Sequence, residues 1–285
     1  MSQMSLTLLL RRAFRVVLLV VAACGRRDRP PPDRPSQPTL TVAPDPQAPT
    51  TGRRVVAVGQ IAQTWHAGAW SPASITLSDV AAGDAIVVLG AYWVDLTAGP
   101  NIAPTDDRGV LRSAVNQGPL IVGKKKPPVL TQLYVEFDAA PGAHTIIPPY
   151  LGGAAGDGTL YVVQVRGLTE HRVVTTGQSW TKGDAIASVS VAPEGAAAPD
   201  DLVIALGGYD NTQPCEHPGW SHPPPGWIPL GLQDDATNNV PSELCYRAAP
   251  ASGAPSVTWT WTDPTVNVTA AAIADNAIDA GAVAA

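Results

Sequence analysis

Short apolar runs separated by turn residues are the feature that most limits how this chain can fold. Residues 132–138 alternate between apolar and polar side chains, and this period of two predicts a half-buried strand. Residues 85–89 are apolar throughout and predict a central strand that is covered on both faces. No stretch keeps a helical period over three turns, so we expect an all-β fold. Turn signals separate the runs at 82–84, 141–142, 157–158 and 182–184.

The order of the predicted strands repeats along the chain. Residues 83–93 resemble residues 200–210, and residues 134–146 resemble residues 245–259. Each half contributes about five predicted strands. The two pseudo-repeats extend over about 74–168 and 187–278.

One β domain over residues 55–285 explains this repeat best. A single half would leave one apolar sheet face open to water, and a second sheet can cover it. We therefore expect a β-sandwich of two packed sheets, with long crossing loops that favour a jelly-roll arrangement. Two separate immunoglobulin-like domains are the alternative, although no linker-like break divides the halves.

The first residues have the layout of an exported lipoprotein. Three arginines precede an apolar run at 16–23, which is too short to span a bilayer. The run ends in Val21-Ala22-Ala23-Cys24, which resembles the bacterial lipobox. The resemblance implies that Cys24 receives diacylglycerol on its thiol and that the signal peptide, residues 1–23, is removed. An ordinary secretory signal with an incidental cysteine is the alternative.

Residues 24–54 predict a tether between this lipid and the domain. Eight prolines lie between Pro30 and Pro49. Because proline fixes φ and removes a backbone donor, we expect neither helix nor sheet here, but a disordered and partly polyproline-II spacer. The expected location is therefore the bacterial cell envelope, at the outer membrane or the cell surface, with the membrane as a partner through the lipid anchor.

The charge of the domain excludes one class of partner. From residue 55 onward, nine Lys and Arg stand against 21 Asp and Glu, a net charge of −12. An acidic surface repels phosphate backbones, so nucleic acid is not an expected partner.

Several segments carry a family resemblance. The Gly83-Asp84 pair with its following apolar run, the strand pair at 133–146 and the run at 160–168 are similar to a widespread family of exported bacterial β-sandwich modules. The resemblance implies a β-sandwich on a secreted or surface protein, and it brings no catalytic residues with it. Members of that family often have Glu in the penultimate strand, where this chain has Gln164.

With Cys24 lipidated, Cys215 and Cys245 form an even pair in an exported chain, which predicts a disulfide. The bond would close a loop of about 31 residues, worth roughly 3–4 kcal/mol in the chain-entropy model. Two free buried thiols are the alternative.

The proline-rich loop at 209–230 is the candidate ligand site. Aromatic rings on a stiff loop can stack on the faces of sugars at a low entropy cost. The alternative is that the loop tryptophans lie beneath it as a small core of its own. The candidate residues are Tyr209, His217, Trp220, His222 and Trp227.

No metal or organic cofactor is expected from the sequence. Cys215, His217 and His222 lack a further ligand once the cysteine is paired. The oxygen-rich loops at Asp106-Asp107 and 234–239 are candidates for a structural Ca²⁺, with solvated turns as the favoured interpretation. Trp259 and Trp261 share one strand face, which we expect to be core, opposite a face of threonines.

The expected function is non-enzymatic. No G-x-S-x-G or H-E-x-x-H motif occurs, and no catalytic residues are assigned. A surface-displayed binding or structural module, recognising a glycan or an envelope protein, fits the tether. The alternative is a carbohydrate-active enzyme on a jelly-roll scaffold, which two carboxylates facing each other at about 5–10 Å would favour.

The lipobox generates the first testable prediction. Growth with a clickable fatty acid should label the wild-type chain, and Cys24→Ala should lose the label because its side chain has no thiol to acylate. Cys245→Ala is the matched control and should keep the label. Persistent labelling of Cys24→Ala, measured by in-gel fluorescence, would contradict the assignment.

Overall fold

The structure is a computed structural model in which the chain forms two compact units, Met1–Pro35 and Ser36–Ala285. The predicted signal peptide and Cys24 lie outside the residues that the structure describes, all of which belong to the second unit. These residues are 39–41, 54–66, 74–94, 103–113, 129–149, 155–167, 176–183, 188–192, 201–211, 220–221, 224–233, 242–248, 255–261 and 268–278.

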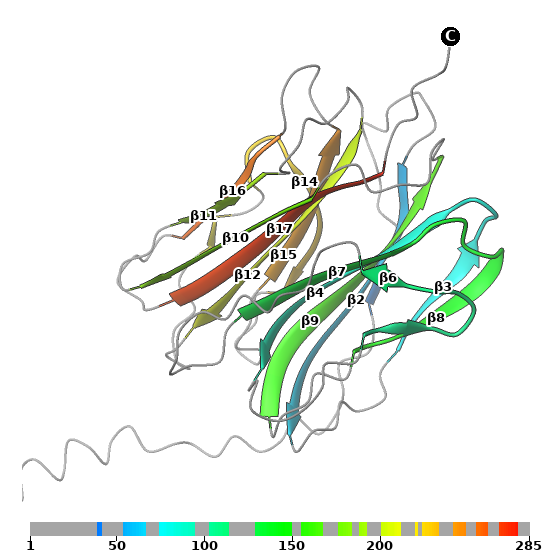
Figure 1. The fold of residues 1–285 in the computed structure, drawn as a ribbon, viewed down its shortest axis with the longest axis horizontal. Helices are drawn as coiled ribbons and strands as arrows, with labels where there is room; N and C mark the ends of the chain where they lie inside the picture. Colours follow the sequence, from blue (N-terminus) through cyan, green and yellow to red (C-terminus); the bar gives the residue numbers. More distant parts are fainter. Residues whose placement is uncertain are drawn as a thin grey trace, which may run out of the picture. The chain divides into compact units, whose positions relative to one another are not determined.

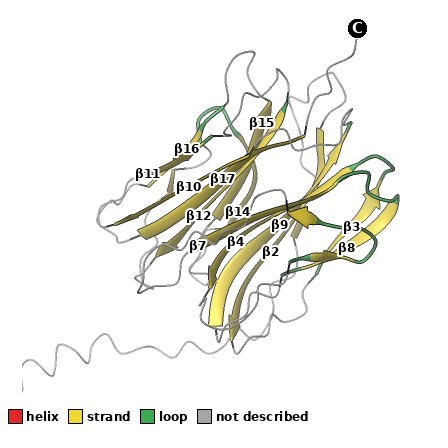
Figure 2. Ribbon diagram, in the orientation of Figure 1, coloured by secondary structure: helices red, strands yellow, loops and turns green. Residues whose placement is uncertain are grey.

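The described residues confirm the predicted all-β fold. They contain strands and loops but no helix, as Figure 2 shows, and every strand pair among them is antiparallel. A helix of the length and hydropathy that a membrane span requires is likewise not found in this part of the chain.

Two large sheets carry most of the strands (Figure 1). The first sheet has the order β1 (Thr39–Thr41), β2 (Arg54–His66), β9 (Ala155–Arg166), β4 (Ala85–Val94), β7 (Val129–Glu136) and β6 (Arg112–Ser113). The second has the order β10 (Thr176–Gly183), β17 (Val268–Ile278), β12 (Leu202–Asn211), β15 (Ser242–Ala248) and β14 (Ile228–Gln233).

Each half of the chain adds a small three-stranded sheet. The first has the order β3 (Ile75–Val80), β8 (Gly142–Ile147) and β5 (Thr105–Asp106). The second has the order β11 (Ser188–Val191), β16 (Val257–Trp261) and β13 (Trp220–Ser221). The sequence predicted two packed sheets, and the structure has two large sheets together with one small sheet in each half.

The two halves share one strand order. β2-β9-β4-β7-β6 in the first half corresponds to β10-β17-β12-β15-β14 in the second, and β3-β8-β5 corresponds to β11-β16-β13. The registers agree as well, since Leu89 pairs with Leu133 and Leu206 pairs with Leu244. Each residue of one half therefore has a defined counterpart along these strands.

One apolar core joins the two large sheets. It contains Val87, Leu89 and Val163 from the first sheet and Ile204 and Leu206 from the second, all of them fully buried. The alternate residues of the same strands, such as Ile86 and Val88, belong to a second core beneath the small sheet of the first half. The prediction that residues 85–89 are covered on both faces is thus confirmed.

β7 is more enclosed than its sequence predicted. Its apolar residues Leu133 and Val135 lie in the core between the large sheets. Its polar face is buried too, since Gln132 and Glu136 expose only 2% and 7% of their surface. The prediction of a half-buried strand is therefore wrong, because the second core and the loop after β5 cover the face that alternation alone assigns to water.

The tether prediction needs a correction at three residues. Thr39–Thr41 form β1, an edge strand whose partner is β2, with Leu40 opposite Gly59. The three residues contain no proline, and an edge strand tolerates prolines beside it because one of its sides needs no partner. The sheet therefore begins inside the segment where we expected none.

The turn predicted at residues 157–158 is also wrong. Both residues lie within β9 and pair with Trp93 and Tyr92 of β4. A Cβ at Gly158 would come within 2.5 Å of Cδ1 of Tyr92 and 3.0 Å of the Ala91 carbonyl oxygen. Glycine is required here for close approach of the Tyr92 ring and not for a turn. The turn predicted at 82–84 does form, with Gly83 at a φ of 83°.

A buried hydrogen bond between the halves gives a second prediction. The Tyr161 hydroxyl donates to the Ser242 carbonyl oxygen at 3.0 Å and lies 3.0 Å from Ser242 Oγ. Tyr161→Phe should lower the free energy of unfolding by about 1–3 kcal/mol, because it leaves a buried carbonyl without its donor. Ser242→Ala keeps that carbonyl bonded and should cost less. Urea denaturation compares the two, and equal losses would contradict this role.

Candidate functional site

The buried polar face of β7 is the starting point for the candidate site. Glu136 is the last residue of this strand, and Gly109 lies so close to its carboxylate that any side chain there would collide with it. Glu136 Oε2 is enclosed and has no hydrogen-bond partner among the described residues. A buried carboxylate oxygen without a partner is unfavourable, so its neighbours decide how its charge is balanced.

The end of β5 places a second carboxylate, that of Asp106, beside Glu136. Asp106 Oδ1 accepts a hydrogen bond from the Arg108 backbone N–H at 3.0 Å, which folds the loop after β5 back on itself. Asp107 ties the same loop to β8, because its Oδ1 accepts from the Thr145 N–H at 2.7 Å and its own N–H donates to the Thr145 carbonyl. The loop is thus fixed at both residues.

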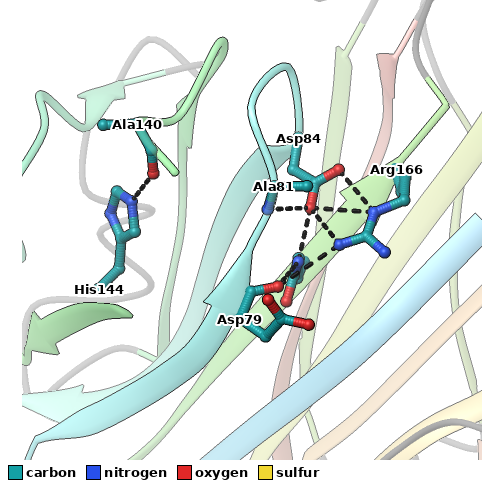
Figure 3. A network of polar contacts seen from close by, with 7 residues as sticks. Asp79, Ala81, Asp84, Ala140, His144 and Arg166 are labelled. Carbon is teal, nitrogen blue, oxygen red and sulfur yellow. Dashed lines mark hydrogen bonds and ion pairs between the residues drawn. The ribbon is translucent and has the colours of Figure 1, made fainter. Parts of the chain in front are cut away.

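His144 completes the cluster from β8. Its Nδ1 lies 2.6 Å from Asp106 Oδ2, and its Nε2 lies 2.6 Å from the Ala140 carbonyl oxygen. The side chains of His144 and Asp106 are both fully enclosed. Figure 3 shows the contact with Ala140. A carbonyl oxygen only accepts, so Nε2 carries a hydrogen and Nδ1 is the atom that faces the carboxylates.

The pKa values of Glu136 and His144 are both raised in this cluster. Burial, followed by the hydrogen bond and the negative charge of Asp106, raises the pKa of Glu136 to about 7. Burial by itself lowers the pKa of His144, but its bonds to Ala140 and Asp106 and the two carboxylate charges raise that pKa above its usual value. One donor atom from each side chain lies within 4.8 Å of the others. The cluster is therefore a compact site for protons or for one cation.

The sequence indicates this cluster only in part. It marks Asp106 with Asp107 as a candidate Ca²⁺ loop, but it assigns no function to Glu136 or His144. His144 faces inward with Ile146, while Ala143 is exposed and Thr145 half-buried. A histidine in the inward phase of an alternating strand was the available signal.

A second buried polar network lies at the turn between β3 and β4 (Figure 3). Asp84 accepts hydrogen bonds from the Ala81 N–H at 2.9 Å, from Gln164 Nε2 at 2.6 Å and from Arg166, whose NH2 lies 2.9 Å away. Gln164 and Arg166 also donate to the Asp79 carbonyl oxygen. The network closes the turn onto β9, and Asp201, at the corresponding position of the second half, is buried as well.

The residues of the predicted loop site are only partly described. Trp220 belongs to β13 and pairs with Trp261, and Tyr209 belongs to β12 and pairs with Ala270. Trp227 is 5% exposed, donates its indole N–H to the Ser256 carbonyl oxygen and has the Arg247 guanidinium 5.8 Å from its ring centre. Trp227 is therefore buried against residues outside the loop, Ser256 and Arg247. His217 and His222 lie outside the described residues.

Cys245 is a fully buried thiol in β15 and forms no disulfide with any residue that the structure describes. Its predicted partner Cys215 lies outside the described residues, so their disulfide stays a prediction. Burial raises the pKa of the Cys245 thiol, and the charge of Glu243 adds to the shift. Glu243 accepts the indole N–H of Trp259 at 2.9 Å, and Trp259 is fully buried, which confirms that its strand face is core.

Comparisons with family models, with curated proteins and with solved structures find no match to this chain. The geometry of the described residues is accordingly the basis for assigning a role.

The Asp84 network generates the third prediction. Burial alone raises the pKa of Asp84, but the bonds from Arg166, Ala81 and Gln164 outweigh it and leave the pKa below its usual value. The ionised Asp84 therefore stabilises the fold at pH values above the unfolded pKa of about 4. This stabilisation is lost as the pH falls through the lower pKa that Asp84 has in the folded state.

Asp84→Asn should thus be less stable than the wild type at pH 7 by about 1–3 kcal/mol, and the difference should shrink on acidification. Asp79→Asn removes an exposed carboxylate beside the same turn and should change stability by less than about 0.5 kcal/mol. Denaturation series between pH 7 and pH 2 measure both variants. A constant difference across that range would contradict the role of the ionised Asp84.

Proposed function

We propose that the chain is an exported lipoprotein whose β domain is a non-enzymatic binding or structural module at the bacterial cell surface. The lipobox and the proline-rich spacer support the anchoring. Because β1 begins at Thr39, the spacer is shorter than the composition suggested and runs from residue 25 to residue 38. At about 3.1 Å per residue, it holds the domain up to roughly 43 Å from the lipid.

The closed geometry of Asp106 and Glu136 is the observation that carries the non-enzymatic assignment. Glycosidases place two carboxyl groups on either side of the scissile bond, about 5–10 Å apart, so that a sugar or a water fits between them. In this chain, donor atoms of the two acids lie within 4.8 Å of each other and of His144. The Asp106 side chain is fully enclosed, and this arrangement leaves no room for a glycosidic bond between the acids.

A glycan or an envelope protein is the proposed partner of the surface near β13. This strand lies at the edge of its sheet and begins with Trp220. Since Trp227 packs inward, the proposed contact surface rests on Trp220 together with Tyr209, His217 and His222. Tryptophan contributes more than most residue types at binding surfaces, which makes Trp220 the residue to test.

A glycan array with the full-length protein in detergent tests this proposal as the fourth prediction. Wild-type protein should bind a defined set of glycans, and Trp220→Ala should lose that binding while its stability stays within about 1 kcal/mol of the wild type, as for an exposed position. The bound glycans should be recovered intact, because the module does not cleave them; mass spectrometry of the array spots checks this.

Trp227→Ala is the matched control from the same loop. Removing this buried ring should cost roughly 3–5 kcal/mol in the free energy of unfolding. A similar loss for Trp220→Ala would place Trp220 in the core and overturn the contact surface. Shortened glycans in the recovered fraction would favour the carbohydrate-active enzyme instead.

A further inference from the structure

The cluster of Asp106, Glu136 and His144 presents the donor set of a metal site. Two carboxylates and one imidazole converge from β5, β7 and β8, with one donor atom of each within 4.8 Å of the others. A tetrahedral ion with bonds of about 2.0–2.2 Å places its ligand atoms roughly 3.3–3.6 Å apart. His144 Nδ1 and Asp106 Oδ2, now 2.6 Å apart, need to separate by less than about 1 Å to accept it.

The hydrogen bond of His144 to Ala140 prepares the correct ring nitrogen for coordination. Because Nε2 lies 2.6 Å from a carbonyl oxygen, it carries the hydrogen and Nδ1 is directed at the carboxylates. Metal-binding histidines usually donate their second ring N–H to a carbonyl or carboxylate, which fixes the orientation of the ring. Ala140 fills this supporting position.

Glu136 supplies an independent indication of a ligand. Its side chain is 93% buried, and Oε2 has no hydrogen-bond partner among the described residues. Buried carboxylate oxygens are normally satisfied by a donor or by a metal ion. The Glu136 carboxylate occupies the space beside Gly109, because a Cβ at residue 109 would overlap it.

The second half of the chain has a different residue at the position of Glu136. Glu136 pairs with Ile86, and the corresponding pair in the second half is Arg247 with Val203. There the Arg247 guanidinium lies over the ring of Trp227, and the buried residues from 255 to 259 are Pro255, Val257 and Trp259. Among the described residues of the second half, the same topology therefore forms with an arginine in place of Glu136 and without a histidine.

We propose that Asp106, Glu136 and His144 bind one divalent transition-metal ion of the zinc type. A nitrogen ligand within a small, enclosed site suits Zn²⁺, whereas Ca²⁺ takes six to eight oxygen ligands and Mg²⁺ retains several waters. The ion links the end of β5 to β7 and β8. This assignment replaces the Ca²⁺ loop that the sequence suggested at Asp106-Asp107, and it does not depend on the proposed partner of the domain.

Calorimetric titration of the untagged full-length protein in detergent with ZnCl₂ tests the site, after the protein has been stripped with a chelator. We expect one equivalent of Zn²⁺ to bind and CaCl₂ or MgCl₂ to leave no comparable signal. Glu136→Gln keeps the shape of the side chain and removes a charged ligand. It should weaken Zn²⁺ binding by at least about 100-fold, since the loss of a supporting partner alone costs about 10–100-fold. Asp79→Asn, an exposed carboxylate outside the cluster, should bind as the wild type does.

Two further measurements keep the proposal open to refutation if a variant folds poorly. Zinc X-ray absorption of the wild type should report one histidine nitrogen, with oxygen for the remaining ligands. The melting temperature of the wild type should rise with added Zn²⁺, and that of Glu136→Gln should not. Unchanged Zn²⁺ affinity in Glu136→Gln, a spectrum with two or more histidines, or no Zn²⁺ binding by the wild type would each overturn the site.

Discussion

The apolar layer between the two large sheets is the constraint on which the rest of the fold depends. β4 and β9 are buried on both faces. One face packs against the small sheet of the same half, and the other face packs against the large sheet of the other half. Burying one large aliphatic side chain contributes about 1.5–3 kcal/mol, and many such residues lie in this shared layer. A single half would expose them all to water. The polar contacts between the halves, such as Tyr161 with Ser242, are consequences of that packing.

Burial on both faces also explains where the polar networks occur. A strand with two covered faces has no solvent side, so every polar residue on it needs a partner inside the protein. Gln164 on β9 finds Asp84, and Glu243 on β15 finds Trp259. On β7 the balance is incomplete, because Gln132 Oε1 and Glu136 Oε2 lack hydrogen-bond partners among the described residues. The candidate site includes one of these unpartnered oxygens, Glu136 Oε2, and a bound ligand could supply the partner that it lacks.

The sequence predicted the fold class and the repetition of similar strands along the chain, because both depend on local patterns. Period-two alternation, the apolar run at 85–89 and the turn at Gly83 are visible within a few residues. The sequence does not predict β2, because Gly59 and Gln60 interrupt the alternation of apolar and polar residues. In the structure, Ile75 packs so closely against Gly59 that a Cβ at residue 59 would collide with it. The turn predicted at 157–158 is wrong for a similar reason, because Gly158 makes room for the Tyr92 ring on a neighbouring strand. The sequence pattern of one strand does not show which side chains of the neighbouring strand pack against it.

The candidate site was harder to predict, because its residues come from three strands. Asp106 and His144 are 38 positions apart, and no spacing along the chain marks their contact at 2.6 Å. The internal repeat indicates the site through a difference between its two halves. Aligning Leu133 with Leu244 matches Glu136, which is buried, with Arg247, which is half-buried, so the charge at this position is reversed between the halves.

Gln164 shows how one side-chain amide determines the charge of a buried network. Here its amide donates to Asp84 at 2.6 Å, and Arg166 supplies the single positive charge that balances the single carboxylate. A Glu at residue 164 would place two carboxylates side by side around one guanidinium, so that one of them would have to take up a proton. The amide therefore keeps the network neutral, with Asp84 ionised, and a substitution that looks conservative in sequence changes which group holds the charge.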